Sequence, residues 1–186
     1  MNQPSPNQHR LAYRLTWLSV MLLACWCVAQ QGPTRVDRKT FVGKPALDFS
    51  VTDLDGNPLL LSSLKGKVVY IEFWTSYHTE CVERMKEIQR LFEATDRNHL
   101  VILPVTAESN LIAQDFLRAH QMTVPAYTDS SGAAHATYLV HAMPLSVVVD
   151  KSGTVVEYVQ PEGDFASVLQ ALRKAGIVVK GSSNKT

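Results

Sequence analysis

Apolar and polar positions follow one another along the chain in a pattern that predicts strands and helices from about residue 41 onward. Two continuous apolar runs, residues 68–74 and 100–106, predict strands that are buried on both faces of a sheet. Between them, residues 78–94 carry apolar side chains at helical spacing and predict an amphipathic helix. Residues 111–120 predict a second helix for the same reason.

The segments on either side of this central part add further strands and a closing helix. Residues 46–52 predict a strand that ends in a turn at residues 53–57. Residues 145–149 and 154–159 are strand-like runs separated by Asp-Lys-Ser-Gly, which is typical of a hairpin, and residues 165–175 predict a helix. The order is β-α-β-α-β-β-α behind an N-terminal β-hairpin. We therefore expect an α/β domain with a mixed central sheet flanked by helices on both faces.

The first 30 residues form a segment of a different kind. Arg10 and Arg14 precede an uncharged apolar run at residues 15–29, and this arrangement is typical of a secretory signal or a membrane anchor. The run is shorter than the ~20 residues of a standard spanning helix. Three alternatives stay open: an uncleaved anchor, a lipoprotein signal with the lipid on Cys25, and ordinary cleavage after Ala29.

These patterns divide the chain into four parts. Residues 1–30 are expected to be a signal peptide or membrane anchor, 31–40 a linker, 41–179 the folded domain and 180–186 a flexible tail. If the N-terminus stays in the cytoplasm, all three alternatives for the first part place the domain outside it. We expect a bacterial inner-membrane protein whose soluble domain faces the periplasm or the cell exterior, with a lipoprotein or a secreted form as variants.

The charge of the chain excludes few classes of function, whereas the number and positions of its cysteines limit its redox chemistry. The net charge is +1 and no basic stripe is present, so we expect no nucleic-acid partner. The three cysteines are Cys25, Cys27 and Cys81, and the first two lie inside the N-terminal apolar run. The predicted domain therefore contains one cysteine and cannot form an internal disulfide.

Several short motifs, in order, carry a resemblance to a known family. They are Val-Gly-Lys-Pro-Ala-Leu-Asp-Phe at 42–49, Asp-Leu-Asp-Gly at 53–56, Leu-Ser-Ser-Leu-Lys-Gly-Lys-Val-Val at 61–69, Phe-Trp at 73–74 and Tyr-Leu-Val-His-Ala-Met-Pro at 138–144. Together they resemble the thioredoxin-like family of TlpA, ResA and the cytochrome c maturation reductases, grouped with the redoxins of the AhpC/TSA type. The resemblance implies a thioredoxin-like fold and descent from a thiol–disulfide oxidoreductase.

The redox motif of this family departs from its usual form in this chain. The family has Trp-Cys-x-x-Cys where this sequence has Tyr77-His-Thr-Glu-Cys81, so His78 replaces the first cysteine. Arg84 replaces the family's glutamate three residues past the second cysteine, and Lys86 stands near the place of its proline. The first cysteine is the nucleophile, because a helix N-terminus stabilises its thiolate. Without it, dithiol exchange by this chain alone is not possible, whether or not the protein is an enzyme.

The resemblance implies roles for other residues at the same site. Glu72 matches the buried acid under the second cysteine and would take a proton from Cys81; alternatively, it is a partly solvated strand end or is paired with a lysine. Pro144 matches the family's cis-proline, which faces the redox motif. With Tyr77, His78 and Met143 it would form the substrate groove.

His78 has two interpretations. The sequence around it can also be compared with the motif of the peroxiredoxins, which belong to the same group. His78 is either a tolerated polar residue or a ligand for Cu(I) together with Cys81 and Met143, to which His120, His135 or His141 would add. No other cofactor is expected. A peroxiredoxin site needs Pro-x-x-x-Thr-x-x-Cys, but Trp74 and His78 occupy the proline and threonine positions, which disfavours that activity.

The sequence thus leaves two classes of function. The first is a membrane-tethered, thioredoxin-like protein with a residual single-thiol redox role, in which Cys81, aided by Glu72, forms a mixed disulfide with a protein partner that supplies the second thiol. The second is a non-catalytic binding module beside Pro144 or a Cu(I)-binding protein.

Overall fold

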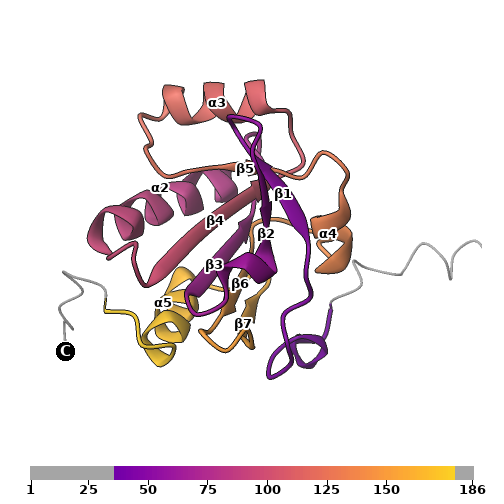
Figure 1. The fold of residues 1–186 in the computed structure, drawn as a ribbon. Coiled ribbons are helices and arrows are strands. Elements are labelled where there is room, and N and C mark those ends of the chain that lie inside the picture. The colour runs from indigo at the N-terminus through magenta and orange to yellow at the C-terminus, as the bar shows by residue number, and fades with distance from the viewer. Residues whose placement is uncertain (1–35, 179–186) are drawn as a thin grey trace, which may run out of the picture. The chain divides into compact units, whose positions relative to one another are not determined.

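The computed structural model describes residues 36–178 and places in them a single mixed sheet with helices on both faces (Figure 1). The strands are β1 (Ser50–Asp53), β2 (Pro58–Leu60), β3 (Val68–Phe73), β4 (Leu100–Thr106), β5 (Tyr127–Thr128), β6 (Leu145–Val149) and β7 (Val155–Val159). The helices are the short η1 (Arg38–Thr40) and η2 (Leu61–Leu64), then α2 (Thr79–Ala94), α3 (Asn110–Ala119), α4 (Ala133–Thr137) and α5 (Phe165–Lys174). The strand order is β2-β1-β5-β4-β3-β6-β7.

Strand β3 is an interior strand of the sheet, between β4 and β6. It pairs in parallel with β4 and antiparallel with β6, and all six of its residues are buried. A strand with covered faces and neighbours on both sides is apolar at most positions, which is why residues 68–74 are apolar apart from Glu72. The prediction of a doubly covered strand here is confirmed.

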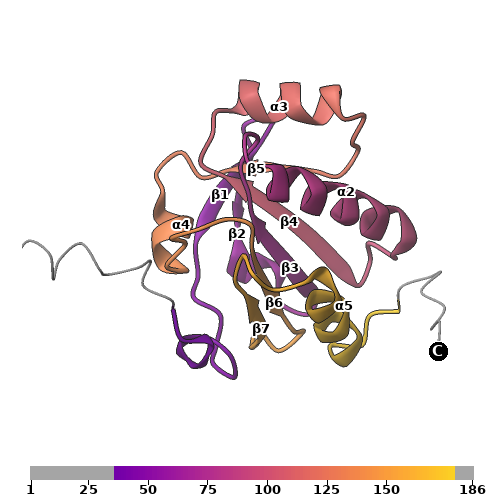
Figure 2. The same cartoon turned by 180° about the vertical axis from the view of Figure 1, so that it is seen from behind.

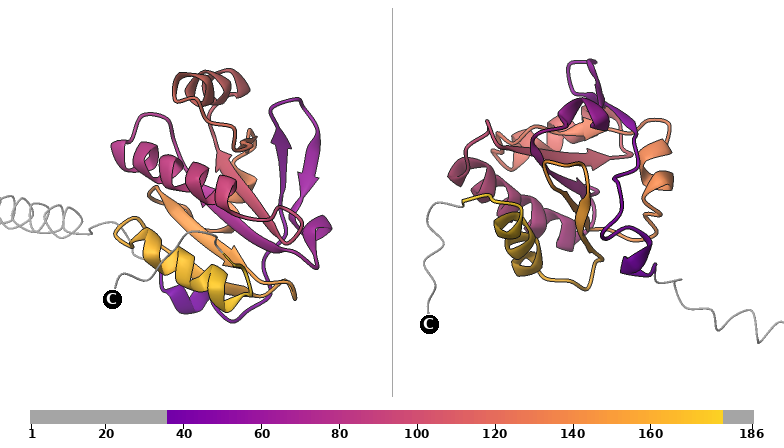
Figure 3. Two further views of the ribbon diagram at one scale, coloured as in Figure 1. Left: turned by 90° about the vertical axis from the view of Figure 1, so that its left-hand side faces the viewer. Right: turned by 60° about the horizontal axis from the view of Figure 1, so that its bottom comes forward.

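The side chains of β3 alternate between two apolar cores because successive residues of a strand point to opposite faces. Val68 and Tyr70 pack with side chains from α2, α3 and α5 in the first core. Val69 and Ile71 pack in the second core, with residues of the N-terminal segment and α4. Helices α2 and α5 lie side by side over the same face of the sheet (Figure 2 and Figure 3).

Most predicted elements agree with the structure to within one or two residues. The strands 100–106 and 145–149 are found with their predicted bounds, and the helix predicted over 78–94 begins one residue later. The strand predicted over 46–52 is shorter, because β1 starts only at Ser50, where it pairs with Leu60 of β2. Apart from the short helices η1 and η2, two elements were not predicted, β5 and α4. They have two and five residues, which is too short to show a periodicity.

The segment before the predicted start of the domain already packs on it. Gln160 donates a side-chain hydrogen bond to the carbonyl oxygen of Val36, and Arg38 forms an ion pair with Glu157 of β7. Phe41 stacks on the ring of Tyr158, with ring centroids 4.8 Å apart. Residues 36–40, the end of the predicted linker, therefore lie against the last strand of the sheet.

The predicted signal or anchor at residues 1–30 and the predicted tail at 180–186 lie outside the described residues. Among residues 36–178, no helix has the length and apolar character needed to cross a membrane.

Candidate functional site

The candidate site lies around the loop that joins β3 to α2. Strand β3 ends at Phe73, and His78 is the N-cap residue of α2. Its backbone is extended, and its side chain makes no hydrogen bond to the first turn of the helix. Tyr77 is 71% exposed, and its ring meets that of His78 edge-on at 4.7 Å. The position at which the family resemblance expects the nucleophile is thus on the surface and carries an imidazole.

Cys81 lies in the first turn of α2 and is fully buried, with 0% exposure. It is the single cysteine of residues 36–178 and is a free thiol. Burial raises the pKa of the Cys81 thiol to about 11, although a hydrogen bond with the backbone of Thr75 acts in the opposite direction. Since the thiolate is the nucleophilic form of cysteine, this thiol is a weak nucleophile at neutral pH.

Glu108, two residues after the end of β4, binds the loop that precedes α2. Its carboxylate accepts hydrogen bonds from the backbone N–H of Ser76 at 2.9 Å, from the Ser76 hydroxyl at 2.8 Å and from the Thr75 hydroxyl at 3.2 Å. The Thr106 hydroxyl, at the end of β4, also donates to it. Glu108 was not recognised from the sequence, although polar residues directly after two parallel strands are a detectable signal, because those strand ends share one edge of the sheet.

Removing this carboxylate should loosen the loop. Glu108→Ala leaves the Ser76 N–H and three hydroxyls without this acceptor, so we expect a loss of about 1–3 kcal/mol in the free energy of unfolding and faster amide exchange at residues 75–78. Glu108→Gln keeps one acceptor oxygen and should lose less. Urea unfolding and hydrogen exchange measure both effects. Unchanged exchange at Ser76 in Glu108→Ala would show that this clamp does not hold the loop.

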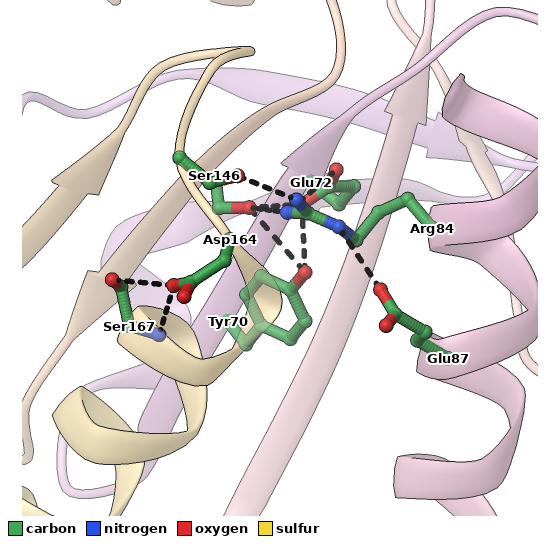
Figure 4. Close-up of polar contacts among 8 residues, drawn as sticks. Tyr70, Glu72, Arg84, Glu87, Ser146, Asp164 and Ser167 are labelled. Carbon is green, nitrogen blue, oxygen red and sulfur yellow. Dashed lines mark hydrogen bonds and ion pairs between the residues drawn. The ribbon is translucent and has the colours of Figure 1, made fainter.

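Glu72 is completely buried beneath the site, at the end of β3 (Figure 4). One of its carboxylate oxygens, Oε2, accepts hydrogen bonds from the hydroxyls of Tyr70, at 2.7 Å, and Ser146. The other, Oε1, lies 3.8 Å from Nη1 of Arg84 and has no hydrogen-bond partner among the described residues. Of the two alternatives to a catalytic acid, partial solvation is wrong, and the pairing with a basic residue is found with an arginine in place of a lysine.

Arg84 reaches this carboxylate from α2, where it lies one turn after Cys81 and is almost as buried, with 8% of its side chain exposed. Its guanidinium donates to Ser146 Oγ at 2.9 Å and to the carbonyl oxygen of Gly163 at 3.1 Å. It also lies 5.4 Å from the ring centroid of Phe165. Arg84, which stands where the family has a glutamate, is therefore buried and lies next to the carboxylate of Glu72.

The buried side chains of Glu72, Arg84 and Cys81 influence one another's pKa values. Burial raises the pKa of Glu72, while Arg84, Ser146 and Tyr70 oppose the rise. Burial also acts to lower the pKa of Arg84, but Glu72, Tyr70 and Glu87 together outweigh it and the net shift is upward. The negative charge of Glu72 contributes to the raised pKa of Cys81, whereas Arg84 lowers it.

Met143 and Pro144 come directly before β6 and are joined by a cis peptide bond, in agreement with the cis-proline implied by the resemblance. Pro144 is buried, and Met143 is partly buried against both apolar cores. Ser146, two residues further on, belongs to the Glu72 cluster. The segment proposed as one wall of the groove is therefore connected to the buried ion pair.

Two of the three histidines considered as extra copper ligands, His120 and His135, have other contacts. His135 Nδ1 lies 2.7 Å from Asp129 Oδ2, and the ring of His120 packs on Phe116 at 4.5 Å. Burial acts to raise the pKa of Asp129, but hydrogen bonds from His135 hold it below its ordinary value. No group of three or more His, Cys, Asp and Glu residues gathers among residues 36–178. The set of His78, Cys81 and Met143 stays a prediction.

The fold and site together define a class of protein. A cis-proline leads into β6 opposite a helix that begins at the loop after β3, within a mixed sheet with helices on both faces, and this is the thioredoxin-like fold. The sequence model of the AhpC/TSA family matches residues 42–158, so the chain belongs to the AhpC/TSA family.

The similar proteins are thiol–disulfide oxidoreductases and thioredoxins. The chain is 27% identical over 169 residues to the thiol-disulfide oxidoreductase ResA of Bacillus thuringiensis subsp. konkukian, covering 90% of this chain and 98% of that protein. It is 30% identical over 152 residues to a ResA of Bacillus cereus, covering 81% and 88%. The crystal structure of the exposed lipoprotein thioredoxin of Streptococcus pneumoniae is similar with a TM-score of 0.59 and 26% identity, covering 69% of this chain and 99% of that one.

Proposed function

We propose that this chain is an exported, membrane-tethered thioredoxin-like protein that binds a protein partner through its redox-site surface and does not catalyse dithiol exchange. The observation that carries the proposal is the state of Cys81, which is the single thiol of residues 36–178 and is fully buried, while the exposed position at the start of α2 is His78. Exchange with release of the substrate needs one thiol that attacks and a second that resolves the mixed disulfide.

The remaining surface retains features suited to binding. Tyr77 is exposed beside His78, and tyrosine is a residue type enriched among the energetically dominant contacts of interfaces. Met143 and Pro144 form the other side of the proposed groove. A partner segment lying in this groove would be held by noncovalent contacts alone, so binding would be independent of redox conditions.

The proposed location rests on the sequence and on one similar protein. The basic and apolar segment at residues 1–30 supports export with an anchor or a lipid, in which case the domain faces the periplasm or the cell exterior. The similar structure from Streptococcus pneumoniae is described as an exposed lipoprotein. Labelling the domain of intact cells with a membrane-impermeant amine reagent tests this location.

The absence of exchange is tested by the dithiothreitol-driven reduction of insulin, in a chain carrying Cys25→Ser and Cys27→Ser so that one thiol remains. We expect turnover no faster than that of the matched Cys81→Ala variant, because no second thiol is present to release a bound substrate. Turnover by the chain with Cys25→Ser and Cys27→Ser at the rate of a dithiol thioredoxin would contradict the proposal.

A second candidate is the single-thiol role predicted from the sequence, in which Cys81 forms a mixed disulfide with a partner thiol. One observation favours it: Cys81 is in the first turn of α2, where unpaired backbone N–H groups and the helix dipole stabilise a thiolate. Incubation with oxidised glutathione separates the candidates. An adduct on Cys81 of the folded chain, detected by mass, supports the single-thiol role, and its absence until urea is added supports a binding role.

A further inference from the structure

One end of the sheet carries four exposed lysines that form no ion pair within residues 36–178. They are Lys44, Lys65, Lys67 and Lys151, here called the lysine face. We infer that the lysine face binds the anionic headgroups of membrane lipids and so presents the redox-site surface away from the membrane. This inference rests on the proposed function, because it takes the domain to be tethered beside a membrane.

Three segments that are far apart in the sequence form the lysine face. The backbone N–H of Gly66, between Lys65 and Lys67, donates a hydrogen bond of 3.1 Å to the carbonyl oxygen of Lys151 in the turn between β6 and β7. Lys65 and Lys67 both line a hollow of about 50 Å³ beside this turn. The carbonyl oxygen of Lys44 accepts a hydrogen bond from the first residue of β7. Because these segments meet only in the fold, the sequence shows no basic stripe.

The acids on this face leave the lysines unpaired. Asp48 Oδ1 accepts a hydrogen bond from the backbone N–H of Ser62 at 2.9 Å, and Asp150 Oδ1 accepts from the backbone N–H groups of Ser152 and Thr154. Both aspartates line the same hollow, and within residues 36–178 neither forms an ion pair. The lysine face thus carries four ammonium groups against two carboxylates, an excess of two positive charges.

The redox loop lies at the opposite end of the sheet, and its surroundings are acidic. Strand β3 starts directly after Lys67 and ends about 20 Å further on at Phe73, where the redox loop begins (Figure 1). Glu80 and Glu83 lie near the start of α2 at that end, and the pairing of β1 with β5 and of β5 with β4 places Asp53 there as well. An anionic surface therefore attracts one end of the domain and repels the other.

The attraction is local, because the domain as a whole is acidic. All 17 Asp and Glu residues of the chain lie within residues 36–178, whereas several of its 18 Lys and Arg residues lie outside. At physiological ionic strength a charge acts over about 8 Å, so acids about 20 Å away have little influence on a bilayer that touches the lysine face. Each basic residue near an anionic bilayer strengthens the attraction about fivefold, so an excess of two charges favours the docked state about thirtyfold.

The proposed tether is long enough for this orientation. The carbonyl oxygen of Val36 accepts a hydrogen bond from Gln160, which follows the end of β7 that is paired with the start of β6. Val36 is thus about one strand length, or about 17 Å, from the lysine face. Residues 30–35 span up to about 20 Å when fully extended. An anchor that ends at Ala29 therefore leaves enough chain for the lysine face to touch the bilayer.

The test uses the full chain inserted into bilayers through its own N-terminal segment. Bilayers of phosphatidylcholine alone are compared with bilayers that also contain phosphatidylglycerol, and mass spectrometry measures how fast an amine reagent acetylates each lysine. At physiological salt, the lysine face should react at least about tenfold more slowly on the anionic bilayers. Lys86 on α2, with 42% of its side chain exposed, should react equally fast on both. Salt at about 1 M, which shortens the screening length to about 3 Å, should abolish the difference.

Charge reversal separates the lysine face from the net charge of the chain. Lys65→Glu together with Lys67→Glu should make the two remaining lysines of the face react equally fast on both bilayers, because the excess of positive charge is gone. The matched control is Lys86→Glu together with Arg118→Glu, which changes the net charge by the same amount at exposed positions outside the face. This control should keep the slow reaction of the lysine face on the anionic bilayers. Circular dichroism checks that both variants fold.

Three outcomes would overturn the inference. They are equal reaction rates of the lysine face on the two bilayers, loss of the difference in the control variant, and equal slowing by inorganic phosphate without a bilayer, which would identify a site for a free anion. The first and third use the unaltered chain and do not depend on the folding of a variant. Insulin turnover, or release of the chain from the bilayer at high salt, contradicts the proposed function and not the lipid preference of the lysine face, so the two failures are distinguishable.

Discussion

Arg84→Met should lower the free energy of unfolding by about 3–5 kcal/mol, which is the expected cost of removing one partner of a buried ion pair. The methionine fills a similar volume but leaves the carboxylate of Glu72 in the core without a counter-charge. Ser146 and Gly163 also lose a hydrogen-bond partner. Urea unfolding followed by circular dichroism measures the loss. A change below about 1 kcal/mol would show that the pair does not stabilise the fold.

Two control variants separate the buried charge from other effects of the substitution. Arg118→Met removes an arginine whose side chain is 80% exposed and paired with Asp115, so its effect should stay within about 0.5 kcal/mol. Adding Glu72→Gln to Arg84→Met removes the unpaired charge while keeping an acceptor for Tyr70 and Ser146. We expect this double variant to be more stable than Arg84→Met alone, because the two residues are coupled.

The stability deficit of Arg84→Met should depend on pH in a defined direction. Losing Arg84 raises the pKa of Glu72 further above its value in the unfolded chain, so the folded variant binds a proton more tightly than the unfolded one. The deficit relative to the unaltered chain is therefore smallest at pH values below the unfolded carboxyl pKa of about 4.3 and grows as the pH rises through the folded pKa. A deficit that is the same at acidic and neutral pH would assign the loss to packing.

The outline of the fold was predictable from the sequence because its central elements are long and strongly patterned. Strands β3 and β4 are buried on both faces and therefore read as continuous apolar runs, and α2 has 16 residues at helical spacing. Strand β5 and helix α4 were missed because two and five residues cannot show a period. Their structure is determined by pairing with β1 and β4 and by packing on Tyr138.

Individual residues of the site were predictable from the sequence, but the contacts between them were not. Glu72 and Arg84 were each recognised, one as a candidate acid and the other as a departure from the family. Their pairing depends on which face of α2 meets β3. The spacing of Arg84 three residues after Cys81 contains that information, since residues three apart share a helix face. Glu108 was missed because its contacts with Ser76 join two loops that are far apart in the sequence.

Cys81 is, on this account, a buried and unreactive thiol, and its rate of alkylation by iodoacetamide tests this directly. A thiol of pKa about 11 is about one thousandth ionised at pH 8, whereas an ordinary thiol of pKa about 8.5 is about one quarter ionised. Burial of the sulfur reduces the rate further.

We therefore expect Cys81 of the folded chain to react more than about a hundredfold more slowly at pH 8 than in the urea-unfolded chain. The rate should rise with pH toward an apparent pKa of about 11. Mass spectrometry of the peptide that contains Cys81 separates it from Cys25 and Cys27. Alkylation of the folded chain at the rate of the unfolded one, with an apparent pKa below about 8, would contradict the account and identify a live redox thiol.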